Sequence, residues 1–297
     1  MAELFEWLQF VLAPQVINGA SIGVAVVLMA LGLTIIFGLL DVINMAHGEF
    51  YAIGAYAAVA LLGVGVPFWW ALFLTPLMMA VLGYVTERAL IQRVFHSKDR
   101  HTLTLLLTFG LAIVLEDALK IVFGANPLRL EAPISGASEF LGLYFPNYRL
   151  FVMAVGSLVI GVVWVVVFRT RLGAMVRAAA YDRNMTASLG VPVSVVYAGT
   201  FAFGVALAGL AGALLAPIYS VFPTMGRDFV LIAFSVVIIG GMGSIKGAVI
   251  AGLVLTQIQS ISSLYISPVW SDPLLFAIMV IVLMWRPQGL FGRLGHA

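Results

Sequence analysis

The stretch GLTIIFGLLDVINMAHGEFYAIGAY, residues 32–56, decides the fold. It contains two apolar segments separated by a short polar element with four polar or charged side chains: Asp41, Asn44, His47 and Glu49. Unpaired polar groups are costly in a lipid bilayer, so such a break persists only where protein or a water-filled cavity satisfies it. The stretch therefore predicts a broken membrane helix beside a pathway for a polar solute.

The polar side chains of this break have a structural interpretation as well as a functional one. Asn44 is able to cap a new helix, and Glu49 lies near the positive N-terminal end of that helix. On the functional side, backbone groups freed at the break line a passage for solute. The proximity of His47 and Glu49 in the sequence is also compatible with a proton relay or a metal site. His-Gly-Glu has too few ligands for zinc, so a metal site is not expected. We expect a structural hydrogen bond from His47, no metal site and no cofactor.

Composition places the chain among integral membrane proteins. Of its 297 residues 63% are hydrophobic and 9% are charged, whereas a soluble domain carries about 25% charged residues. The 15 Lys and Arg nearly balance the 13 Asp and Glu, so no nucleic-acid partner is indicated. The absence of cysteine excludes disulfides, thiolate chemistry and cysteine metal sites. We predict one membrane-spanning domain over residues 1–297.

Apolar runs of membrane-spanning length follow one another along the chain. They predict an all-α, polytopic protein with eight or nine membrane segments, some of them broken. The count stays open because the seventh and eighth segments, joined at 241–247, are either two helices around a cytoplasmic turn or one broken, re-entrant element. The predicted segments are 16–40, 48–66, 67–87, 102–124, 149–168, 193–216, 228–241, 245–263 and 268–286.

The basic residues predict an external N-terminus and a cytoplasmic C-terminus. Cytoplasmic connections of membrane proteins carry an excess of Lys and Arg. With this orientation the inner connections hold eleven basic residues and the outer ones hold three, with Lys120 inside a span. The inner residues are Arg88, Arg93, Lys98, Arg100, Arg169, Arg171, Arg177, Arg183, Lys246, Arg286 and Arg293, and the outer ones are Arg129, Arg149 and Arg227.

A second break, FSVVIIGGMGSIKGAVIAGLVL (234–255), is rich in glycine. Small residues recur there at every fourth position, which lets neighbouring membrane helices approach closely. The run lacks the G-x-x-x-x-G-K-[ST] spacing of a phosphate loop, so it predicts no ATP site. We expect helix packing and a tight turn at Gly240, Gly241, Gly243 and Gly247.

The connection RTRLGAMVRAAAYDRNMTASLGVPVS (169–194) predicts an amphipathic helix over about 174–189. Met175, Ala178, Met185 and Leu189 form one face, interrupted by Asp182, and a polar face lies opposite. Such a helix lies on the lipid surface or docks into a cytoplasmic partner, and the residues alone do not separate the two. The polar face consists of Arg177, Tyr181, Asn184 and Ser188.

These motifs together resemble the permease subunits of branched-chain amino acid ABC importers. The resemblance is carried in family order by 32–56, by RTRLGAMVRAAAYDRNMTASLGV (169–191), by GGMGSIKGAVIAGLVL (240–255) and by RPQGLFGR (286–293). Within the family the chain is similar to the shorter of two homologous permeases.

The resemblance implies a bacterial inner-membrane complex in which this chain is not itself an enzyme. Its implied partners are a longer homologous permease, two cytoplasmic ATP-binding subunits and a periplasmic solute-binding protein, besides membrane lipid. The resemblance also makes the 169–192 connection the helix that couples to the ATPase, although Arg177 and Asn184 stand where the wider importer motif has Glu and Gly. From the polar face of this helix, with Asp182 added, we predict its contact residues, which are Arg177, Tyr181, Asp182, Asn184 and Ser188.

The solute stays open at this point. Leucine, isoleucine and valine are the first expectation, and urea, short amides and aromatic acids are alternatives carried by related permeases. A proton-coupled secondary transporter that uses His47, Glu49 or Glu116 is the alternative of another class. An intramembrane enzyme fits poorly, because no nucleophile or second ligand accompanies His47 and Glu49.

Overall fold

The computed structural model describes residues 7–94, 97, 99–140, 143–267 and 270–292, and most of them are helical. A π-helical turn, η1 (Leu8–Leu12), leads into the first helix, and a second π-helical turn, η2 (Glu87–Ile91), follows α4. The helices are α2 (Ala13–Leu40), α3 (His47–Gly63), α4 (Phe68–Thr86), α5 (Gln92–Val94), α6 (Arg100–Phe123), α7 (Asn147–Arg169), α8 (Arg171–Tyr181), α9 (Arg183–Ser188), α10 (Val193–Leu215), α11 (Met225–Gly240), α12 (Ile245–Ser262) and α13 (Ser271–Trp285).

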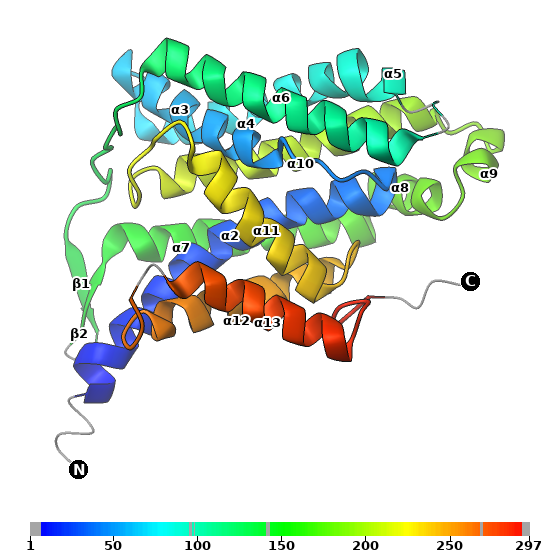
Figure 1. Ribbon diagram of the computed structural model, residues 1–297. Helices are drawn as coiled ribbons and strands as arrows, with labels where there is room; N and C mark the ends of the chain where they lie inside the picture. Colours follow the sequence, from blue (N-terminus) through cyan, green and yellow to red (C-terminus); the bar gives the residue numbers. More distant parts are fainter. Residues whose placement is uncertain (1–6, 95–96, 98, 141–142, 268–269, 293–297) are drawn as a thin grey trace.

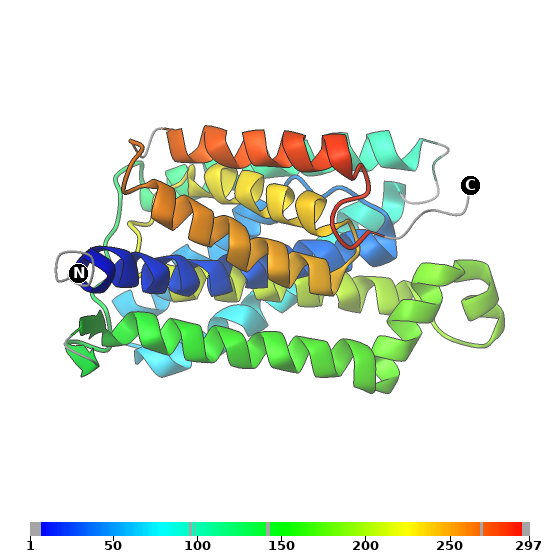
Figure 2. The same cartoon turned by 90° about the horizontal axis from the view of Figure 1, so that it is seen from below.

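Helix α2 runs through the middle of the bundle, with α7 on one flank and α13 on the other (Figures 1 and 2). It packs against α12, α10, α7 and α11, and most of its residues from Gly19 to Leu40 are buried. The apolar helix that contains it extends over 31 residues, Phe10–Leu40, or about 46 Å at 1.5 Å per residue. Because this exceeds the roughly 30 Å hydrocarbon core of a bilayer, the helix must tilt or extend beyond it.

Five helices in the described part of the chain are long and apolar enough to cross a membrane, and α13 contributes a shorter apolar helix. The prediction of a helical, multi-pass membrane protein is therefore confirmed at that level. Helices α3, α6 and α11 occupy the predicted segments 48–66, 102–124 and 228–241. The five are Phe10–Leu40, Phe68–Val94, Asn147–Arg169, Val193–Leu215 and Ile245–Ser262.

A two-stranded antiparallel hairpin departs from the all-α prediction. It consists of β1 (Ala137–Phe140) and β2 (Leu143–Pro146), which pair from Ala137 opposite Pro146 to Phe140 opposite Leu143. The hairpin lies beside the start of α2 and of α7, at what we call the hairpin end of the bundle (Figure 1). Upstream of it, Leu128 and Val221 exchange two backbone hydrogen bonds of 2.8 Å. The hairpin and this bridge order the long connection between α6 and α7.

The opposite end of the bundle, the α9 end, carries α5, α8, α9 and the residues that follow α13 (Figure 1). Here the single helix predicted over 174–189 is wrong. The chain forms α8 and α9, separated at Asp182, whose backbone is extended (φ −149°, ψ 107°). Asp182 Oδ1 accepts a hydrogen bond of 2.9 Å from the Met185 N–H, the arrangement of a helix N-cap. The acidic side chain thus begins a new helix and interrupts the amphipathic pattern.

Candidate functional site

The polar break begins where α2 ends at Leu40. Asp41 adopts the left-handed conformation (φ 52°, ψ 43°), and its N–H donates to the Phe37 carbonyl at 2.9 Å. Residues 42–44 have no regular secondary structure, and Met45 and Ala46 form a turn before α3 starts at His47. Val42, Asn44 and Ala46 are buried, whereas Ile43 is exposed.

Asn44 and His47 point into the protein, and both side chains are 0% exposed. Asn44 Oδ1 accepts a hydrogen bond of 3.1 Å from the Ala46 N–H, and the Asn44 carbonyl accepts one of 3.2 Å from the His47 N–H. His47 Nε2 lies 3.0 Å from the Met29 carbonyl oxygen in the middle of α2. These contacts shape the turn and tie it to α2. Both side chains therefore support the conformation of the break from its buried side.

Glu49, one turn into α3, is 3% exposed and lies against the first turn of α11. Its Oε1 is 2.7 Å from the position that a Cβ atom would take on Gly226. Its Oε2 has no hydrogen-bond partner among the described residues. This carboxylate is therefore enclosed between α3 and α11.

Asp41, by contrast, lies apart from the other three polar residues of the break. Its carboxylate is more than half exposed and pairs with the first residues of α6, at 3.4 Å from Arg100 Nη2 and 3.5 Å from His101 Nε2. The structure thus brings Asn44, His47 and Glu49 into the interior and leaves Asp41 at the surface.

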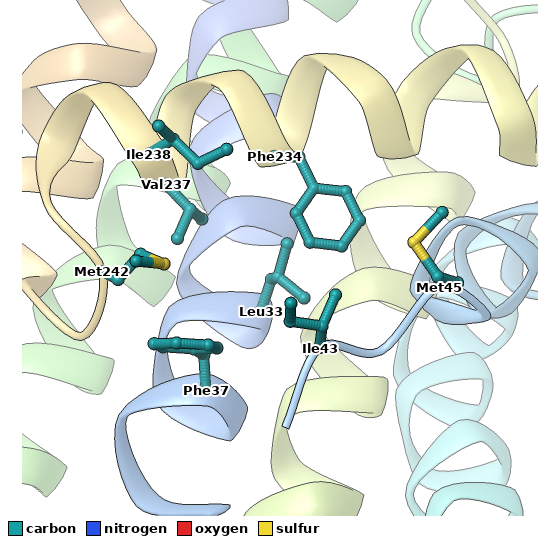
Figure 3. A pocket seen from close by; sticks show the side chains of 8 residues that line it. All are labelled: Leu33, Phe37, Ile43, Met45, Phe234, Val237, Ile238 and Met242. Atoms are coloured by element: carbon teal, nitrogen blue, oxygen red, sulfur yellow. The ribbon is translucent and has the colours of Figure 1, made fainter. Parts of the chain in front are cut away.

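An apolar groove of about 170 Å³ lies between α2, the polar break and α11 (Figure 3). Ile43 and Met45, both from the polar break, form one wall. Neither residue is among the site residues predicted from the sequence. Both are large apolar side chains next to Asn44 in the break, and that position beside a predicted polar pathway is the signal that could have found them. The other lining residues are Leu33, Phe37, Phe234, Val237, Ile238 and Met242.

The glycine-rich second break is a tight turn between α11 and α12, at the α9 end. Gly241 and Gly243 have positive φ angles of 99° and 80°, which favour glycine. Ser244 caps α12, with its Oγ accepting a hydrogen bond of 3.1 Å from the Gly247 N–H. Gly240 and Gly247 pack backbone against backbone, since a Cβ on Gly240 would lie 2.5 Å from the Gly247 carbonyl carbon.

The residues after α13 complete this turn. Leu290 N–H donates to the Ile239 carbonyl at 2.8 Å, and Phe291 N–H donates to the Gly240 carbonyl at 3.1 Å. The last carbonyls of a helix have no intrahelical partner. The C-terminal segment 286–292 therefore satisfies the end of α11.

An ionic cluster around the buried carboxylate of Glu116 joins α6 to α11 at the hairpin end. Glu116 Oε1 is 2.7 Å from Lys120 Nζ, four residues further along the same helix. Glu116 Oε2 also accepts from Arg227 Nη2, a partner 111 residues away that spacing along one helix does not reveal. Lys120 contacts Asp117 at 3.1 Å as well. Among the described residues no group of three or more His, Cys, Asp or Glu could hold a metal ion.

The α8–α9 connection presents an exposed apolar tip. Tyr181 is 90% exposed, and Leu172, Met185 and Leu189 are also largely exposed. Arg177 differs, because its Nη1 donates to the Val167 carbonyl and its guanidinium lies 5.7 Å from the centre of the Phe168 ring. Arg177 thus anchors α8 to the end of α7. Ser188 Oγ donates to the Asn184 carbonyl at 3.0 Å within α9.

A solved structure shows the same overall fold. PsaBC from Streptococcus pneumoniae in complex with Fab matches 97% of this chain and 96% of its own, with a TM-score of 0.51 and 15% sequence identity. At that identity the likeness concerns the fold alone.

Sequence comparison identifies the family. The profile described as branched-chain amino acid transport system / permease component matches residues 15–283. The chain is 32% identical over 294 residues to the high-affinity branched-chain amino acid transport system permease protein LivH of Salmonella typhimurium, covering 94% of this chain and 95% of that protein. It is 30% identical to BraD of Pseudomonas aeruginosa, covering 99% and 98%.

The paired permeases of that system differ in length, and this places the chain within the family. LivM of Escherichia coli is 27% identical over 95% of this chain, but the match covers 71% of LivM. The match to LivH covers 95% of the relative. The chain therefore belongs to the family of membrane permease components of branched-chain amino acid transport systems, and it corresponds to the shorter, LivH-type permease.

Proposed function

We propose that this chain is a pathway subunit of an ATP-driven importer in the bacterial inner membrane, which takes up branched-chain amino acids delivered by a periplasmic binding protein. The observation that carries the proposal is the match to LivH and BraD along almost the entire chain. Its partners are a longer LivM-type permease, two cytoplasmic ATP-binding subunits and the binding protein. ATP hydrolysis belongs to the partner subunits.

In this proposal the chain crosses the membrane nine times, as α2, α3, α4, α6, α7, α10, α11, α12 and α13. The hairpin end faces the periplasm and the α9 end faces the cytoplasm. The distribution of charge supports this orientation: Arg100, Arg169, Arg171, Lys246 and Arg286 all lie on elements of the α9 end. Lys and Arg are enriched in the cytoplasmic connections of membrane proteins.

The exposed tip of α8 and α9 is the part that we assign to the ATPase. Tyr181 presents an almost fully exposed aromatic side chain there, with Met185 and Leu189 beside it in the chain. Large exposed apolar side chains at a surface are typical of binding sites for other proteins. Arg177 and Asp182 support this tip by fixing α8 to α7 and by starting α9, and Asn184 and Ser188 lie on α9 itself.

The pathway in this subunit follows the polar break. Ile43 and Met45 line the groove beside α11, while Asn44 shapes the turn of the break and His47 holds it against α2. A wall of branched and thioether side chains suits solutes with small apolar side chains. The ATPase drives transport only if its closed state binds one permease conformation more tightly than the other.

The test is ATP hydrolysis by the chain co-purified with its neighbouring permease, ATPases and binding protein in nanodiscs. The binding protein is loaded in turn with leucine, isoleucine, valine, urea, a short amide or an aromatic acid. Stimulation by the branched-chain amino acids establishes the importer and its substrate together. Stimulation by urea or an aromatic acid alone keeps the importer and changes the solute. Uptake by the chain alone along a proton gradient overturns the proposal.

The tip assignment has its own test in the same assembly. Tyr181→Ala should abolish stimulation of the ATPase by the loaded binding protein, whereas Asn147→Ala, at the hairpin end, should not. Unchanged stimulation and uptake in Tyr181→Ala would show that the ATPase docks elsewhere.

A further inference from the structure

One carboxylate at the hairpin end has more cationic partners than it needs. Glu116 is held by Lys120 at 2.7 Å through one oxygen and by Arg227 through the other. Its side chain is 5% exposed, whereas that of Arg227 is 66% exposed. Lys120 alone would leave Glu116 paired, so Arg227 is free to leave without stranding a buried charge.

A second buried carboxylate nearby has too few partners. Glu49 is 3% exposed, and its Oε2 has no hydrogen-bond partner within the described part of the chain. A buried carboxylate without partners is costly. Arg227 directly follows Gly226, the residue of α11 against which the Glu49 carboxylate lies. The cation that would satisfy Glu49 is thus at hand but bound to Glu116.

The helices that carry Glu49 and Arg227 meet through glycine. A Cβ on Gly226 would lie 2.7 Å from both the Gly48 carbonyl oxygen and Glu49 Oε1. These glycines precede Glu49 and Arg227 directly in the sequence. Beside the glycines the rings of Tyr51 and Phe229 pack with their centres 4.4 Å apart, so the turn of α11 that carries Arg227 is held against the turn of α3 that carries Glu49.

We propose that Arg227 exchanges between Glu116 and Glu49 during the transport cycle, so that it latches the outer end of α11 alternately to α6 and to α3. The structure shows the α6-bound state. Each state leaves Glu116 paired with Lys120, and the α3-bound state also pairs Glu49. The proposal rests on the importer function proposed above, since it assigns the exchange to the change between the two permease conformations.

The test uses the absence of cysteine from the natural chain. Thr224→Cys places one thiol at the start of α11, and its labelling by a membrane-impermeant maleimide is followed in the full chain in nanodiscs. Glu49→Gln removes the second acceptor and holds α11 in the state seen here. Glu116→Gln removes the first acceptor and favours the other state. The two variants should therefore shift the labelling rate in opposite directions, by about tenfold between them.

The matched control is Asp117→Asn, which removes an exposed acid of the same cluster that contacts Lys120 and not Arg227. It should label at the rate of the parent. Equal labelling of all variants, or a shift of Glu49→Gln and Glu116→Gln in the same direction, overturns the latch. Glu49→Asp and Glu116→Asp, which keep the charge, replace the amides if an amide variant fails to fold.

A second measurement separates the latch from the importer function. In the complete assembly, Glu49→Gln should lower solute uptake about tenfold while the ATP-binding subunits remain bound. If the two variants shift labelling in opposite directions but no ATP-binding subunit co-purifies with the chain, the latch is supported and the importer function is wrong. If the loaded binding protein stimulates the ATPase normally but neither variant shifts labelling, the importer function is supported and the latch is wrong.

Discussion

His47 ties the polar break to the central helix through one long-range contact. Its Nε2 reaches the Met29 carbonyl oxygen at 3.0 Å, and its ring lies beside Gly32, where a Cβ would be 3.2 Å from Cε1. The glycine makes room for the ring, and the ring in turn fills space between α2 and α3. Position 47 therefore needs both a polar group and bulk.

Replacement of His47 measures the two contributions. His47→Ala should lower the free energy of unfolding by about 2–4 kcal/mol, because it removes a buried hydrogen bond and leaves a cavity. His47→Gln, which retains bulk and a polar group, should cost less than about 2 kcal/mol. Denaturant titration of the purified chain in detergent gives both values. Equal losses would mean that the shape of the ring dominates.

At the scale of elements, helices α2 and α10 cross through glycine. A Cβ on Gly204 would lie 2.7 Å from the Gly32 carbonyl oxygen and 2.7 Å from Ile36 Cδ1. Backbone contacts this close are a main source of association between membrane helices.

Substitutions within α10 test this crossing. Gly204→Val should cost about 3 kcal/mol or prevent folding, because the buried neighbours include backbone that must move. Gly199→Val lies in the same helix with no atom within 4 Å of the added Cβ, and it should change stability by less than about 0.5 kcal/mol. Folded yield in detergent, followed by size-exclusion chromatography, distinguishes them. A folded Gly204→Val of normal yield would show that the helices re-pack readily.

The boundary between α8 and α9 depends on Asp182. Asp182→Ala removes the N-cap and should loosen α9 by about 1 kcal/mol, which raises tryptic cleavage after Arg183 about fivefold where cleavage reports the open population. Asp182→Asn keeps an acceptor oxygen and should cleave at nearly the parent rate. If the two variants cleave equally fast, the charge of Asp182 and not its cap stabilises α9.

These elements also show which parts of the structure were predictable. Apolar runs located the helices because burial in lipid requires them, and Asp41 to Glu49 located the break. The start of α9 was predictable too, since Asp is a preferred N-cap residue. The pairing of Leu290 and Phe291 with the end of α11 was not, because backbone hydrogen bonds leave no side-chain pattern. Arg227 with Glu116 was hidden by the 111 residues between them.

For the whole molecule, the two ends of the bundle are expected on opposite sides of the membrane. Tyr144 lies in the hairpin and Leu189 follows α9, and both are largely exposed. Tyr144→Cys should react with an impermeant maleimide in intact spheroplasts, and Leu189→Cys should react only after permeabilisation. The reverse pattern would invert the orientation, and reaction of both in intact spheroplasts would contradict a continuous membrane barrier between them.

The C-terminal segment 286–292 links the last part of the chain to α11. Gly289 has a φ angle of 76°, and a Cβ there would lie 2.5 Å from the Ile238 carbonyl oxygen. Gly289→Val should therefore displace the segment and lower the free energy of unfolding by about 1–3 kcal/mol. Gly63→Val, with open space around the added Cβ, is the control. Equal melting temperatures would show that α11 does not depend on this segment.

The same backbone pairing can form only after the C-terminal segment has been synthesised. The chain is synthesised from its N-terminus at about 5–20 residues per second, so Leu290 follows Gly240 by several seconds. During that interval the carbonyls of Ile239 and Gly240 have yet to meet the amides that they bind in the finished fold. Translation that stops before residue 290 consequently yields a protein in which α12 and α13 are present but the end of α11 keeps unpaired carbonyls.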